Sequence, residues 1–151
     1  MTRKNLMLLA AAGSAALLLG ALGFQYIGGY APCKMCIWQR WPHGVAILLG
    51  LVAYFAPLRI VALGGALAAL TTSGVGFYHA GVEYKWWQGP TSCTGSGLDL
   101  STNLLDFNAD VTIVMCDEIV WDLFGVTMAG YNGLFSLGFA AIWLAAFMRR
   151  G

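Results

Sequence analysis

The charged residues of this chain are separated by long uncharged stretches, and four of these stretches hold between 18 and 29 residues. A helix that spans a bilayer needs about 20 mostly apolar residues, with a range of about 17–25. The pattern therefore predicts an all-α membrane protein, a bundle of four transmembrane helices in a single domain over residues 1–151. We expect the spans at about 6–27, 42–58, 60–80 and 131–148.

The composition supports a membrane protein and excludes a soluble globular domain. Of the 151 residues, 59% are hydrophobic and only 10% are charged, whereas a soluble domain carries about 25% charged residues. We expect the lipid bilayer, and no nucleic acid, among its partners. The first apolar stretch is longer than the 7–15 residues typical of a signal peptide, so we expect it to be a retained helix.

The basic residues predict the orientation of the spans. Basic residues are enriched on the cytoplasmic side of membrane proteins. With the N-terminus inside, the inner residues are Arg3, Lys4, Arg59, Arg149 and Arg150, and the outer ones are Lys34, Arg40 and Lys85. All seven acidic residues fall in the connection between the third and fourth spans, which marks it as exposed to water. We expect both termini in the cytoplasm and periplasmic loops at about 28–41 and 81–130.

Small residues recur within two of the predicted spans at intervals typical of packed helices. They are Ala12, Ala16 and Gly20 in the first span, and Gly65 and Ala69 in the third. Such residues let helix backbones approach closely in lipid, so we expect both sets at helix–helix contacts, with the general abundance of small residues in membrane helices as the alternative.

The four cysteines all fall in the two outer loops. Cys33 and Cys36 form a C-x-x-C motif, and Cys93 and Cys116 lie in the long loop. A disulfide between the second pair would stabilise that loop, but a C-x-x-C ring constrains little chain and is easily opened. The pattern favours thiol–disulfide exchange. A four-thiolate zinc site and inert structural disulfides remain alternatives, although zinc ribbons usually use two close pairs.

Three further side chains are candidates for the same chemistry. If the second helix begins near Cys36, the positive end of its dipole favours a thiolate there, and Arg40 adds a positive charge one turn later. On its own, Arg40 would be interpreted as an arginine that reaches the membrane surface. His79 is an ionisable group at membrane depth, which makes it a functional candidate. His43 is expected at the water boundary.

These residues resemble the DsbB family of disulfide bond formation proteins. The resemblance is carried by Pro32-Cys33-Lys34-Met35-Cys36-Ile37-Trp38-Gln39-Arg40-Trp41-Pro42-His43, Tyr78-His79-Ala80-Gly81-Val82-Glu83, Gly89-Pro90-Thr91-Ser92-Cys93 and Met115-Cys116-Asp117-Glu118. It covers about residues 6–148, but the stretch between Cys93 and Cys116 departs from the versions of the family pattern that we can place, so the resemblance does not define the surface that docks the partner. In that stretch, Leu100, Leu104, Leu105 and Phe107 predict a short amphipathic helix on the membrane surface.

The resemblance implies a multi-pass protein of the bacterial inner membrane that oxidises a periplasmic thioredoxin-like (DsbA-like) protein. The electrons would pass to a membrane quinone, ubiquinone or menaquinone. By this resemblance, Cys93 would form the mixed disulfide with the partner, and Cys116 would exchange with Cys33. Cys36 would react with quinone beside Arg40, and His79 would assist proton transfer. No metal is implied.

Two rival functions are compatible with the same architecture. One is a four-helix membrane scaffold with structural disulfides or a metal site. The other is a relative of vitamin K epoxide reductase, in which the C-x-x-C motif belongs in a late helix. Here the motif precedes the second span, which favours the DsbB-like interpretation.

Overall fold

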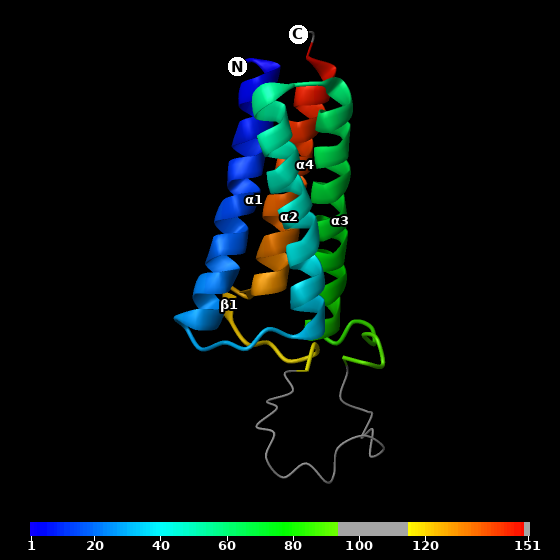
Figure 1. Cartoon of the computed structure of the whole chain (residues 1–151). Coiled ribbons are helices and arrows are strands. Elements are labelled where there is room, and N and C mark those ends of the chain that lie inside the picture. The colour runs from blue at the N-terminus through cyan, green and yellow to red at the C-terminus, as the bar shows by residue number, and fades with distance from the viewer. Residues whose placement is uncertain (94–114, 150–151) are drawn as a thin grey trace.

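The computed structural model describes residues 1–93 and 115–149 of the chain, so the amphipathic helix expected near Leu100 lies outside the described residues. Its main elements are four long helices packed side by side (Figure 1). They are α1 (Arg3–Tyr26), α2 (Lys34–Phe55), α3 (Arg59–Glu83) and α4 (Met128–Met148). The four-helix membrane bundle predicted from the charge pattern is confirmed. By length and composition, α1, α3 and α4 are able to cross a membrane.

The second helix begins at Lys34, before the span expected from about residue 42 and close to the start near Cys36 that the dipole argument considered. Much of the expected loop 28–41 is therefore the first turns of α2. The helix starts there because Cys33 is its N-cap, and the Cys33 sulfur accepts a hydrogen bond from the Cys36 backbone N–H at 3.2 Å. Pro42 lies inside the helix, where it removes one backbone donor without ending the helix.

A short hairpin precedes α4 and was not predicted from the sequence. Its strands are β1 (Asp122–Leu123) and β2 (Val126–Thr127), which pair antiparallel. The turn residues Phe124 and Gly125 both have positive φ, 52° and 75°, as the tight hairpin turn that matches strand twist requires. Thr127 then caps α4 by accepting a hydrogen bond from the Gly130 N–H at 3.2 Å.

Small residues allow the helices to pack closely at the end of the bundle away from the cysteines. Trp143 of α4 is fully buried there, and its indole ring lies directly against Gly65 of α3. Ala69 is buried in the same cluster, so the expectation for α3 is confirmed. The expectation for α1 is wrong, because Ala12, Ala16 and Gly20 are exposed. Ala16 and Gly20 instead line the cavity described below.

The start of α1, the end of α4 and the turn between α2 and α3 lie at one end of the bundle (Figure 1). Arg3 ties them together, since its guanidinium donates to the carbonyls of Pro57 and Arg149. The opposite end carries the start of α2 and the segments on either side of residues 94–114. All four cysteines are at this second end, as the predicted topology requires.

Candidate functional site

The C-x-x-C pair lies at the first turn of α2. Cys33 and Cys36 are free thiols whose sulfurs are 2.8 Å apart. Cys33 is only 4% exposed. Its hydrogen bond with Cys36, together with burial, raises the pKa of the Cys33 thiol. Cys33 therefore holds its proton more tightly than an ordinary thiol does.

Cys93 and Cys116 form a disulfide, with their Cα atoms 5.2 Å apart. The Cys116 N–H also donates to the Cys93 carbonyl at 2.7 Å. Next to the disulfide, the Lys85 ammonium donates to the Asp117 carboxylate at 2.7 Å and to the Asp117 carbonyl at 2.6 Å. The hydrogen bond from Lys85 lowers the pKa of Asp117. This ion pair holds the segment after Cys116 against the end of α3.

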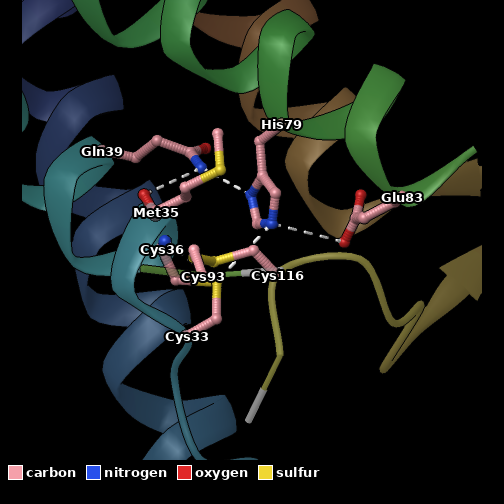
Figure 2. The surroundings of a disulfide bond; sticks show 8 residues. All are labelled: Cys33, Met35, Cys36, Gln39, His79, Glu83, Cys93 and Cys116. Atoms are coloured by element: carbon pink, nitrogen blue, oxygen red, sulfur yellow. Dashed lines mark hydrogen bonds and ion pairs between the residues drawn. A yellow bond between two sulfur atoms is a disulfide. The ribbon is translucent and has the colours of Figure 1, made fainter. Parts of the chain in front are cut away.

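The two cysteine pairs meet in one buried cluster (Figure 2). The sulfurs of Cys33 and Cys116 and one ring nitrogen of His79 all lie within 4.8 Å of one another. Cys116 is fully buried. Thiol–disulfide exchange needs a sulfur close to the disulfide that it attacks. The structure therefore brings the loop pair to the membrane-edge pair through Cys33 and Cys116.

His79 lies at the centre of this cluster and is 2% exposed. Its Nε2 is 3.5 Å from the Cys33 sulfur and 3.9 Å from a carboxylate oxygen of Glu83. Its Nδ1 is 2.9 Å from the side-chain nitrogen of Gln39. Figure 2 shows the ring between Gln39 on one side and the sulfurs and Glu83 on the other.

A cavity of about 440 Å³ adjoins the cluster, between the cysteine-bearing ends of the helices. Cys36, Arg40 and His79 line it, together with apolar side chains of α1, α4 and the segment after Cys116. Arg40 is half-buried, and its guanidinium donates to the Gln25 side-chain oxygen of α1 at 2.5 Å. Ligand pockets of this size and mostly apolar lining hold small molecules whose polar atoms meet a few fixed side chains.

Sequence reasoning missed several polar residues of this region. Glu83 was assigned to the water-exposed loop, but it ends α3 and is 8% exposed. His43 was placed at the water boundary, but it is 3% exposed and bonds Asn132 of α4 at 2.8 Å. Gln39 was not singled out. Glu83 could have been found from its spacing of one helical turn from His79. The contact between His43 and Asn132 could not, because 89 positions separate the two residues in the sequence.

Among the described residues, Cys33, His79 and Cys116 are the group whose donor atoms lie close enough to hold a metal ion. Thiolates, not disulfide sulfurs, ligate zinc. With Cys116 in its disulfide, this group offers one cysteine and one histidine. That set falls short of the four protein ligands of a structural zinc site.

Residues 3–146 match the sequence profile of the family described as "Disulfide bond formation protein DsbB". The chain belongs to the DsbB family. It is 33% identical over 133 residues to disulfide bond formation protein B 2 of Pseudomonas aeruginosa, covering 81% of this chain and 77% of that protein. It is 30% identical over 167 residues to disulfide bond formation protein B of Stutzerimonas stutzeri, covering 97% of this chain and 96% of that protein. No solved structure gave a significant match.

Membership identifies the chain as a multi-pass membrane protein of disulfide bond formation with two cysteine pairs. It also favours the DsbB-like interpretation over a relative of vitamin K epoxide reductase and over an inert scaffold.

Proposed function

We propose that the protein reoxidises a periplasmic thioredoxin-like (DsbA-like) protein and passes the electrons to a membrane quinone, either ubiquinone or menaquinone. The observation that carries this proposal is the meeting of Cys33 and Cys116 beside a mostly apolar cavity at the cysteine-bearing end of the bundle. One sulfur of each pair is in position for exchange. The other sulfur of the membrane-edge pair, Cys36, faces the cavity.

The proposed exchange begins at the loop pair. A thiolate of the reduced partner attacks the Cys93 sulfur, the Cys93–Cys116 bond breaks, and Cys116 leaves as a thiolate. The Cys116 thiolate attacks Cys33 of an oxidised Cys33–Cys36 pair, and Cys36 leaves as a thiolate. The partner's second thiolate then attacks the partner sulfur bound to Cys93, so the partner departs with its own disulfide.

The loop disulfide is restored when the freed Cys93 thiolate attacks Cys116 and releases Cys33. The membrane-edge pair then holds both electrons as a dithiol. This is the redox state seen here, with Cys33 and Cys36 free and Cys93 joined to Cys116. Oxidation of this dithiol back to a disulfide releases two electrons and two protons.

The cavity fits a quinone as the acceptor. A quinone supplies a lipid-soluble ring that takes up two electrons and two protons and becomes a quinol. Cys36 and Arg40 lie on the cavity wall, where Arg40 supplies a fixed positive charge and hydrogen-bond donors for an oxygen that gains negative charge. The apolar side chains of α1 and α4 exclude water and accommodate an apolar tail.

A trapping experiment tests the order of exchange. The probe is a reduced thioredoxin-like protein whose second C-x-x-C cysteine is replaced by alanine. The intact Cys93–Cys116 disulfide of the wild-type chain is the oxidant, and the probe is expected to accumulate on it as a mixed disulfide with Cys93, identified by mass spectrometry of non-reduced peptides. The matched Cys93→Ala variant is expected to accumulate none. An adduct through Cys33 or Cys36 at equal yield would contradict the assigned order.

The orientation is proposed on the same basis. Both termini are assigned to the cytoplasm of the bacterial inner-membrane bilayer, and the cysteine end to the periplasm. Labelling of single introduced cysteines with a membrane-impermeant thiol reagent in intact cells tests this orientation.

A further inference from the structure

A chain of side-chain hydrogen bonds runs through the bundle from the cysteine cluster. The Gln39 amide nitrogen is 3.2 Å from the Met35 carbonyl oxygen and 2.9 Å from His79 Nδ1. The Gln39 amide oxygen accepts from the Asn132 amide nitrogen at 2.7 Å. The Asn132 oxygen is in turn 2.8 Å from His43 Nε2. Gln39 is 6% exposed, so bulk water does not compete for these bonds.

The Met35 carbonyl fixes the direction of this chain. A backbone carbonyl only accepts hydrogen bonds, so the Gln39 group that faces it must be the NH₂ group. That NH₂ group also faces His79 Nδ1, which must therefore be the acceptor. The bond from Asn132 to the Gln39 oxygen requires the same amide orientation. A neutral imidazole with its lone pair on Nδ1 carries its hydrogen on Nε2.

The Nε2 hydrogen of His79 then points toward the exchanging sulfurs. Nε2 lies 3.5 Å from the Cys33 sulfur. The Cys116 sulfur lies within 4.8 Å of the Cys33 sulfur and of one ring nitrogen of His79. A carboxylate oxygen of Glu83 lies 3.9 Å from Nε2, and the ring also forms a hydrogen bond with the Cys116 backbone. A ring N–H in this place stabilises a thiolate on Cys33, the sulfur that exchanges with Cys116 in the proposed function.

We propose that Gln39 is a positioning residue that fixes His79 as the Nε2–H tautomer, so that His79 donates a hydrogen bond to the thiolate formed during exchange between Cys116 and Cys33. The effect on turnover rests on the proposed function, whereas the tautomer does not. This assigns His79 a donor role at the sulfur exchange. It differs from the proton transfer to quinone that the family resemblance implies, because here the Nε2–H is assigned to the Cys33 sulfur at 3.5 Å.

Nitrogen-15 NMR of histidine-labelled protein in nanodiscs tests the tautomer directly. Wild-type His79 is expected to show a protonated Nε2 and an unprotonated Nδ1. In Gln39→Leu, which removes the amide and keeps similar bulk, His79 is expected to lose this single tautomer. The matched control is Ser73→Ala, which deletes another buried bond between α3 and α4, from the Ser73 hydroxyl to the Gly133 carbonyl at 2.9 Å.

A second measurement follows turnover with dithiothreitol as reductant and a short-chain ubiquinone as acceptor. A hydrogen bond to a charged group corresponds to a rate change of roughly tenfold to hundredfold. Gln39→Leu is expected to lower turnover by at least about tenfold, and Ser73→Ala to leave it within about twofold. Gln39→Glu is expected to recover most of the loss, because its carboxylate accepts from Nδ1–H while a doubly protonated ring still donates from Nε2.

A wild-type spectrum with the hydrogen on Nδ1 would overturn the proposal, and this result does not depend on whether any variant folds. An unchanged tautomer and turnover in Gln39→Leu would overturn it equally. If wild-type protein shows the expected tautomer but reduces no quinone, the proposed function fails and the positioning by Gln39 stands.

Discussion

Removal of the Arg40 side chain tests the role of the cavity independently of the role of the exchanging cysteines. Arg40 lines the cavity one turn beyond Cys36, and its guanidinium donates one hydrogen bond to the Gln25 side chain of α1. Its guanidinium therefore has donors left for an oxygen in the cavity. We expect Arg40→Ala to weaken the use of quinone while leaving the use of the thiol donor unchanged.

The size of the effect follows from the burial of the side chain. A hydrogen bond to a charged group contributes about 1.5–3 kcal/mol, which is roughly tenfold to hundredfold in an equilibrium constant. Because Arg40 is half-buried, solvent screening places the expected loss near the lower end, about tenfold in kcat/KM for quinone. Gln25→Leu, which frees the guanidinium but keeps its charge, should give a smaller loss.

Steady-state turnover is measured with varied short-chain ubiquinone at saturating dithiothreitol, which gives kcat/KM for quinone. It is then measured with varied dithiothreitol at saturating quinone, which gives kcat/KM for the thiol donor. Lys34→Ala is the matched control, because Lys34 is an exposed basic residue on the same helix. If Arg40→Ala changes the two values equally, or behaves like Lys34→Ala, then Arg40 is a membrane-surface anchor and the assignment of the cavity is wrong.

Two further predictions concern stability and pH. Gly65→Ala should destabilise the bundle by about 1–3 kcal/mol in chemical unfolding, because a Cβ there meets the fully buried Trp143 ring. The control Gly74→Ala places its Cβ in open space and should not lower the free energy of unfolding. Equal losses in the two variants would contradict the packing. The lowered pKa of Asp117 means that its ion pair with Lys85 stabilises the segment beside Cys116 fully above the ordinary value of 3.8, and this contribution is lost as pH falls through the lowered pKa. Reduction of the loop disulfide by a phosphine should therefore accelerate below that pH in wild type, and a Lys85→Ala variant should lack this acceleration; identical pH profiles would refute the role of the pair.

The charge pattern predicted the bundle because lipid leaves few places for charged residues. It misplaced the start of α2 because it treated each charge as a span boundary. Lys34 is exposed in the first turn, and Arg40 is bound to Gln25 of α1. Both charges therefore fit within a helix, and the helix begins at the cap that Cys33 provides.

The cysteines and His79 were found from the sequence because their residue types are rare and their spacing is local. The supporting residues Gln39, Asn132 and His43 were not found, since their hydrogen bonds form only when α2, α3 and α4 pack together. Glu83 was misread for a related reason. Its place after an apolar span suggested exposure, but Glu83 is buried and forms a hydrogen bond with Thr127 of β2.

The central claim is that electrons leave the chain from Cys36 into a membrane quinone, and quinone reduction by purified protein in nanodiscs tests it most directly. Absorbance of ubiquinone is followed after addition of a reduced thioredoxin-like protein. One quinol is expected for each disulfide made in the soluble protein, and none above background with Cys36→Ser. Full turnover by Cys36→Ser, or no quinone consumption by the wild-type protein with any such donor, would contradict it.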